Sequence, residues 1–159
     1  YIPLCTNLVP TSTVIKHWQT YNQGATEKGQ PLPDRSIWRV SRSIYVGETN
    51  DEAWDHCLNG TFGRAFEYLI TVLGSMNMLH LFKNDPEMPD ESVTPEYILK
   101  NLCIIGDIDS CTQQLHTLWE ETGGFGTLLM IAHDWDDKEK WIKSTELLAK
   151  EVVPTLPDL

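Results

Sequence analysis

The chain of 159 residues is 41% hydrophobic and 22% charged, an ordinary balance for a globular domain that can bury a core. Its formal net charge of −11 argues against nucleic acid and against an anionic membrane surface as partners, because both recruit basic patches. No apolar run approaches the roughly 20 residues that a membrane-spanning helix needs. Four cysteines without metal-type spacing indicate buried free thiols, and we therefore expect a cytoplasmic protein.

The first predicted unit is a short strand followed by a helix. Residues 2–9 are mostly apolar and end at Pro10, and the hydroxyl residues at 11–13 can cap the next helix. Val14 and Trp18 begin the buried face of that helix at helical spacing. Gly29 follows this face, so we expect the helix to end there.

The second unit is a longer strand and a long helix. Residues 37–47, IWRVSRSIYVG, are rich in the β-branched and aromatic side chains that strands favour. Thr49 or Asn50 can cap the following helix, whose apolar face continues to about Ser75. The pattern predicts one uninterrupted helix after this strand.

The stretch 76–102 interrupts the alternation of strands and helices. It is rich in proline and acidic residues, and it favours a loop with a short helix at 95–102. Long loops inside compact domains are usually functional lids or disordered segments. We therefore expect a lid-like insertion, either ordered or mobile, within a single domain that spans residues 1–159.

The last unit contains the most apolar strand of the chain. Asp109 can cap a helix that ends at Gly123, and the run 127–132 shows no alternation of apolar and polar residues. Such a run is typical of a strand that is covered on both faces. A final helix follows, from about Asp136 to Pro154.

The pattern of strands and helices predicts an α/β fold with a parallel sheet, because parallel neighbours require a crossover helix. Three strands with two open edges would be an improbable free-standing domain. The arithmetic instead suits the last three strands of an eight-stranded barrel, which typically has about 250 residues. We therefore expect a partial (β/α)8 barrel of about three strand–helix units.

Three segments carry a resemblance to a known family: IWRVSRSIYVGETNDEAW, IIGDIDSCTQQL and EETGGFGTLLMIAHDWDD. Together they resemble the C-terminal part of the bacterial-luciferase-like flavin-dependent monooxygenases, in the branch of the limonene monooxygenase-like enzymes. The resemblance covers about residues 4–153. The family fold is a TIM barrel, so the resemblance implies that this chain supplies strands six, seven and eight. It also implies that the stretch 76–102 takes the place of the family's active-site loop.

The resemblance implies a reaction as well as a fold. Family members use reduced FMN, supplied by a separate flavin reductase, and O2 to oxygenate a small hydrophobic organic substrate, without a metal. A second reading keeps the barrel but uses F420 for hydride transfer. A third is a non-catalytic truncated paralogue that docks to a barrel partner. A dimer, or a missing N-terminal barrel half, would cover the open edges. The family's main phosphate contacts lie upstream of the matched region.

The carboxyl ends of the strands are where parallel α/β folds place their ligands. His133 follows the last strand, and we expect it to act as the catalytic residue by hydrogen-bonding flavin or substrate, or by donating to the flavin peroxide; alternatively it caps the next helix or pairs with Asp134. Trp135 can form a wall of the isoalloxazine pocket, or simply pack at the helix start. Tyr45 and Glu48 end the middle strand and are expected in the substrate pocket.

Two further residues are candidates for contacts with the cofactor. Arg42 is unusual inside a strand, and a buried arginine needs a partner. That partner can be the flavin phosphate or an acid from the missing half of the barrel. Gly106 lies where a helix begins, and exposed backbone N–H groups there can meet an anionic ligand. Asp107 and Asp109 oppose this, and helix capping is their expected role.

Overall fold

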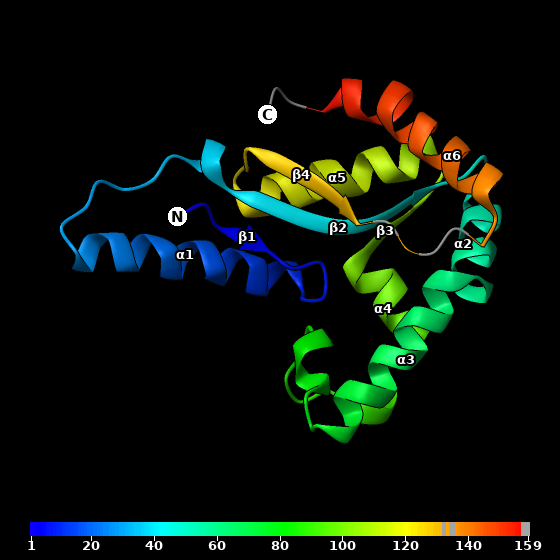
Figure 1. The fold of residues 1–159 in the computed structure, drawn as a ribbon, viewed down its shortest axis with the longest axis horizontal. Coiled ribbons are helices and arrows are strands. Elements are labelled where there is room, and N and C mark those ends of the chain that lie inside the picture. Colours follow the sequence, from blue (N-terminus) through cyan, green and yellow to red (C-terminus); the bar gives the residue numbers. More distant parts are fainter. Residues whose placement is uncertain (132, 134–135, 157–159) are drawn as a thin grey trace.

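A single parallel sheet with helices packed against it organises the chain (Figure 1). The computed structural model describes residues 1–131, 133 and 136–156. The strands are β1 (Leu4–Cys5), β2 (Arg39–Val46), β3 (Cys103–Gly106) and β4 (Thr127–Ile131). The helices are α1 (Thr11–Glu27), α2 (Asn50–Asn59), α3 (Thr61–Ser75), α4 (Pro95–Leu102), α5 (Ile108–Thr122) and α6 (Lys138–Leu147). None of the helices in this described part is long and apolar enough to cross a membrane.

Strand β2 is the centre of the sheet. Its first residues, Arg39 and Val40, pair with β1 on one edge and with β4 on the other. Ser43 of β2 pairs with β3 and also with β4, so β3 and β4 lie on opposite edges of β2. Strand β3 therefore shares an edge of β2 with β1 and pairs with later residues of β2. The order β1, β2, β4 is that of three successive barrel strands, as predicted. Strand β3 is a short addition to this set.

The helix layer packs on the face of β2 that carries Val40, Ile44 and Val46. Successive side chains of a strand point to opposite faces, which explains why these three residues all have even numbers. Helix α1 contributes Val14 and Trp18 to this core, which confirms the predicted face of the helix. Helix α5 and the turns that follow α6 add further residues to this core, namely Cys111, Leu115, Leu118, Leu148 and Val152.

Arg35 joins the helix layer to the sheet. Its guanidinium donates hydrogen bonds to the carbonyl oxygens of Thr122 and Gly124, where α5 ends. The same group lies 5.4 Å from the ring centroid of Trp18 and 5.5 Å from that of Trp38. Arg35 therefore satisfies the last carbonyls of α5 and adds two cation–π contacts.

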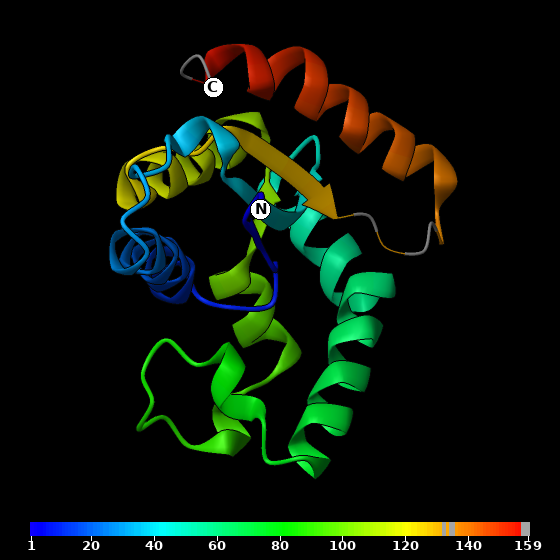
Figure 2. The same ribbon diagram turned by 60° about the vertical axis from the view of Figure 1, so that its left-hand side comes forward.

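In the structure the insertion is wider than the predicted stretch 76–102, because α2, α3 and α4 form one arm that begins at the sheet and extends away from it (Figure 2). Helix α4 has the predicted bounds, because Thr94 caps it and Pro95 occupies its first turn. The stretch between α3 and α4 contains two short 3-10 turns, Leu79–Phe82 and Asp90–Ser92. A second core holds the arm together, and it includes Leu79, Phe82, Val93, Ile98 and Leu99.

Several local predictions were wrong. Strand β3 was not predicted, and the first strand covers only Leu4–Cys5. The helix expected up to Ser75 breaks at Gly60, where an added Cβ would lie 2.3 Å from the carbonyl oxygen of His56. Helix α1 starts after Pro10 without a side-chain cap.

Other signals at helix ends gave better predictions. Thr49 caps α2, as one of the two expected residues. Gly123 ends α5 in the left-handed conformation. Asp107, rather than Asp109, caps that helix by accepting a hydrogen bond from the backbone N–H of Ser110. The four cysteines are free and buried, as predicted.

Candidate active site

His133 lies beyond the carboxyl end of β4, where it meets the middle strand and the insertion. Its Nε2 is 3.1 Å from the hydroxyl oxygen of Ser43 in β2. Its ring centroid is 4.2 Å from that of Phe62 and 5.9 Å from that of Phe66, both in α3. The imidazole is half-buried, so a hydroxyl and two aromatic rings define its position.

A polar path connects His133 to the first strand. The side-chain amide of Asn7, just after β1, donates a 2.9 Å hydrogen bond to the hydroxyl oxygen of Ser43. Asn7, Ser43 and His133 therefore bring together residues from all three barrel strands. Ser43 lies on the face of β2 opposite to the helix layer, which is the inner face of a barrel. Asn7 was not among the predicted site residues, although it follows a strand end in the same way as His133.

Aromatic rings extend from His133 toward the end of β2. Phe62 is 5.1 Å from Trp141 of α6, and Trp141 meets Tyr45 edge-on at 5.1 Å, measured between ring centroids. Tyr45 also stacks on His56 of α2 at 4.7 Å. Tyr45 is only 2% exposed, and burial raises the pKa of its phenol. This aromatic cluster, made of His56, Phe62, Tyr45 and Trp141, joins the sheet, the insertion and the last helix.

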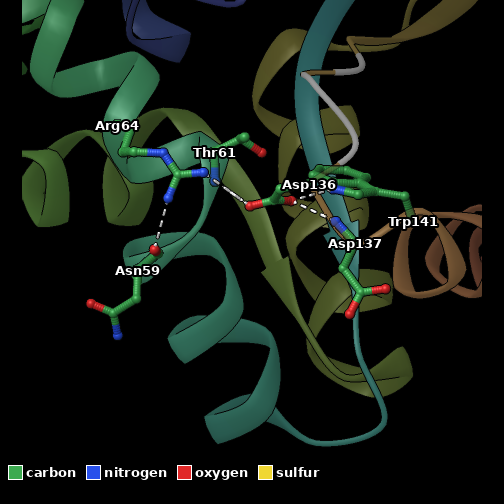
Figure 3. Close-up of polar contacts among 6 residues, drawn as sticks. All are labelled: Asn59, Thr61, Arg64, Asp136, Asp137 and Trp141. Atoms are coloured by element: carbon green, nitrogen blue, oxygen red, sulfur yellow. Dashed lines mark hydrogen bonds and ion pairs between the residues drawn. The ribbon is translucent and has the colours of Figure 1, made fainter.

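Asp136 fixes the chain just beyond His133 (Figure 3). Its Oδ2 accepts hydrogen bonds from the backbone N–H of Thr61 at 2.9 Å and from the guanidinium of Arg64 at 3.3 Å. Its Oδ1 accepts from the indole N–H of Trp141 at 3.3 Å and from the backbone N–H of Asp137 at 3.1 Å. Burial opposes the charge of this carboxylate, but its hydrogen bonds prevail and lower its pKa.

The Asp136 contacts replace a missing cap. Gly60 precedes α3 and has no side chain to accept a hydrogen bond from its first turn. Asp136 supplies that acceptor from a distant part of the chain, and Asp137 caps the following helix α6. The final helix, expected from about Asp136, begins at Lys138. The Asp136 carboxylate holds the insertion against the segment that carries His133.

The predicted substrate-pocket residues Tyr45 and Glu48 have different surroundings in the structure. Tyr45 belongs to the aromatic cluster, whereas Glu48 is exposed and pairs with Lys143 on α6. That pair lowers the pKa of the Glu48 carboxyl group through a hydrogen bond and charge attraction. Both residues line a shallow hollow of about 230 Å³ beside α6. Trp135, predicted as a wall of the flavin pocket, lies outside the described residues.

Gly106 is explained by close packing at the start of α5. Its φ is +156°, and an added Cβ would lie 2.6 Å from Asn50 Oδ1. Asn50 also bonds both to the backbone N–H of Asp107 at 3.0 Å and to its carboxylate at 2.9 Å. The Asp107 carboxylate and the Asn50 side-chain amide therefore already occupy backbone N–H groups at the start of α5. This arrangement opposes the predicted contact between Gly106 and an anionic cofactor.

Arg42 lies on the opposite face of β2 from Ser43 and His133. Its guanidinium donates hydrogen bonds to the carbonyl oxygen of Ser41 at 3.0 Å and to the hydroxyl of Thr11 at 3.2 Å. It therefore points into the helix layer. The contact of Arg42 with the flavin phosphate stays a prediction. Within the described residues, no group of three or more His, Cys, Asp or Glu side chains could hold a metal ion.

The fold and the site together define a class of protein. Three parallel strands, β1, β2 and β4, with polar residues at their carboxyl ends, form one side of a (β/α)8 barrel. Comparisons with known proteins specify the class further.

No family model matches the sequence. The chain is 35% identical over 143 residues to 3,6-diketocamphane 1,6-monooxygenase of Pseudomonas putida, covering 89% of this chain and 38% of that protein. It is 30% identical over 149 residues to limonene 1,2-monooxygenase of Rhodococcus erythropolis, covering 94% and 36%.

A solved structure gives the same relationship. The oxygenating constituent of 3,6-diketocamphane monooxygenase from Pseudomonas putida, a type II Baeyer–Villiger monooxygenase in complex with FMN, superposes with a TM-score of 0.82 at 32% identity. The match covers 97% of this chain and 42% of that one. The chain is thus a relative of the luciferase-like flavin-dependent monooxygenases, as its motifs predicted. It spans about 40% of the length of the relatives that it matches.

Proposed function

We propose that this chain forms the C-terminal side of the barrel of a flavin-dependent monooxygenase. The enzyme would use reduced FMN and O2 to oxygenate a small hydrophobic substrate such as a terpene, a ketone or an aldehyde. The observation that carries the proposal is the combined match in sequence and fold to an FMN-complexed monooxygenase. Reduced FMN, when bound, supplies the chemistry that activates O2.

The residues around His133 fit the ring end of a flavin. Phe62 and Phe66 offer apolar surface, and His133 offers a polar group at the same place. Ser43, Phe62 and Phe66, which contact His133, carry no positive charge that could bind the flavin phosphate. The phosphate site would lie in the part of the relatives' length that this chain does not span. Trp135 stays a proposed wall of the same pocket.

His133 is the proposed catalytic residue, and Ser43 and Asn7 are positioning residues. Because Ser43 accepts a hydrogen bond from Asn7, its own hydroxyl proton can be donated to His133 Nε2. In this proposal Ser43 and Asn7 orient the imidazole toward the flavin or the substrate.

The insertion would exclude water from this site. Its buried residues, including Leu79 and Phe82, share one core with Tyr45 and Trp141. Asp136 fastens α3 to the segment after β4. We infer that the stretch 76–102 acts as a lid-like cover supported by this core, since exclusion of water protects reactive oxygen chemistry.

The partners of the enzyme follow from the same proposal. A separate flavin reductase would supply reduced FMN. The described strands β1 and β4 each pair only with β2, which leaves one edge of each for the rest of a barrel or for a second subunit. F420 in place of FMN, or a non-catalytic role beside a barrel partner, are the competing readings.

The proposal is tested on the complete enzyme that would contain this chain, by flavin binding and by turnover with the His133→Ala variant. Reduced FMN should raise the melting temperature of the protein by mass action, and F420 should not. With a flavin reductase and a camphor-type ketone, His133→Ala should lower product formation at least tenfold, on the order expected for loss of a general acid–base group. His17→Ala, on the exposed face of α1, is the matched control and should retain full activity.

Three results would contradict the proposal. Stabilisation by F420 and not by FMN would replace it with hydride transfer. Wild-type protein that forms no oxygenated product in the presence of reductase would favour the non-catalytic role. Product formation by His133→Ala at the rate of His17→Ala would remove His133 from the mechanism while leaving the reaction itself in place.

A further inference from the structure

A second cavity lies on the helix side of the sheet, away from His133. Its volume is about 210 Å³, and it is bounded by the start of α1, the end of α4, β3 and one face of α5. Arg42 of β2 forms part of its wall, and its side chain is on the opposite face of the strand from Ser43. The cavity is therefore separate from the proposed flavin site.

Arg42 is a buried cation without a matching anion. It is 4% exposed, and among residues 1–131, 133 and 136–156 no carboxylate forms an ion pair with it. Its two hydrogen bonds, to Ser41 and Thr11, leave further N–H donors of the guanidinium unused. Burial lowers the pKa of Arg42, and electrostatic interactions with Cys103, Cys5 and Glu121 partly offset this. A guanidinium that is desolvated in this way favours a negatively charged neighbour.

The other side chains around the cavity strengthen its preference for an anion. Lys100 from the end of α4 adds a second positive charge, and Gln113 and Thr117 of α5 add polar groups. Glu121 is the single acidic residue among those that line it, so the two cations outnumber the acid. This local balance contrasts with the formal charge of −11 for the whole chain.

We propose that this cavity binds a small oxyanion of the phosphate class, with Arg42 as the buried anchor and Lys100 as the outer cation. Guanidinium groups bind phosphate and carboxylate oxygens through paired N–H donors, which suits the unused donors of Arg42. The volume accommodates a phosphate group together with water. The site stands apart from the proposed monooxygenase reaction, and either can fail without the other.

The test is calorimetric titration of the purified protein with inorganic phosphate at constant ionic strength. We expect saturable binding with a Kd of about 1 mM or lower. Lys100→Gln should weaken binding about fivefold, and Glu121→Gln should tighten it by a similar factor, because each changes one charge at the cavity. Both side chains lie on exposed residues, so neither variant threatens the fold.

Arg42→Gln should abolish saturable binding, and Arg39→Gln is its control. Arg39 is an exposed arginine of the same strand and does not line the cavity, so its loss should leave the Kd within twofold. Equal weakening by Arg39→Gln and Lys100→Gln would show general charge attraction and would overturn the proposal. So would a non-saturable titration, or binding of acetate as tight as that of phosphate.

A competition experiment separates this cavity from the flavin site. FMN should leave the affinity for phosphate unchanged, because Arg42 and His133 lie on opposite faces of β2. If FMN displaced phosphate from the wild type, and Arg42→Gln no longer showed this displacement, the cavity would be the site of the flavin phosphate. That result would refute a separate anion site.

Discussion

Removal of the Asp136 carboxylate should loosen the junction between the insertion and the sheet. Asp136→Ala deprives the first turn of α3 of its acceptor, a loss that typically costs about 0.5–2 kcal/mol. It also leaves the indole N–H of the buried Trp141 without this partner, for about 1 kcal/mol more. Arg64 is 59% exposed, so its ion pair adds about 0.5 kcal/mol or less. We expect Asp136→Ala to reduce the free energy of unfolding by about 2–3 kcal/mol.

Asp136→Asn removes the charge but keeps a carbonyl oxygen, so it should cost about 1–2 kcal/mol. The measurement is urea unfolding followed by tryptophan fluorescence, analysed for both the midpoint and the slope. Asp109→Asn serves as the control, because Asp109 is exposed and does not cap α5. That variant should stay within about 0.5 kcal/mol of the wild type.

The effect of Asp136→Asn should depend on pH in one direction. The folded state lowers the pKa of this carboxyl group, so its stabilisation is fully present above the ordinary value of 3.8 and is lost as pH falls through the folded-state pKa. The difference between wild type and Asp136→Asn should therefore be constant from about pH 7 to pH 5 and shrink only below the ordinary pKa. A difference near zero at pH 7, or one that grows on acidification, would refute the role assigned to Asp136.

Three further predictions follow from packing. Gly106→Ala should destabilise the fold by about 2–3 kcal/mol, because its Cβ would overlap Asn50. Gly24→Ala in α1 is the control: its Cβ would meet nothing within 4 Å, so it should stabilise the fold by up to about 1 kcal/mol, and thermal melts compare the two variants. Arg35→Lys should cost about 1–2 kcal/mol in urea unfolding, because an ammonium group lacks the guanidinium plane that contacts Trp18 and Trp38 while its Nη1 donates to two carbonyls. An unchanged midpoint would contradict this. Burial raises the pKa values of Cys103 and Cys111 to about 12, so Ellman's reagent should label these thiols only when the protein unfolds. Fast labelling of both thiols in the native protein would contradict their burial.

The alternation of strands and helices could be predicted because its signals are local. Trp18 and Leu115 fall on periodic faces, and Thr94 with Pro95 marks the start of α4. Strand β3 escaped prediction because its four residues lie between the last turn of one helix and the cap of the next. No turn residue separates them, and a short apolar run reads equally well as helix or strand.

The site could be predicted only in part. The position of His133 follows from the end of a strand, but its neighbours Phe62 and Asn7 belong to distant segments whose contacts no local pattern encodes. Arg42 was assigned to the cofactor because its residue type suggested a ligand. The alternation of side chains along β2 places it on the opposite face from Ser43, and that alternation was already legible in the sequence.

The bond between Asp136 and α3 also bears on the kinetics of folding. The two residues that it joins, Thr61 and Asp136, are 75 positions apart, so forming it early would close a long loop at a high cost in chain entropy. Contacts of this kind usually form after the transition state, where their loss accelerates unfolding and leaves the folding rate almost unchanged. Asp136 should therefore determine how long the native arrangement around His133 lasts, rather than how quickly it is reached.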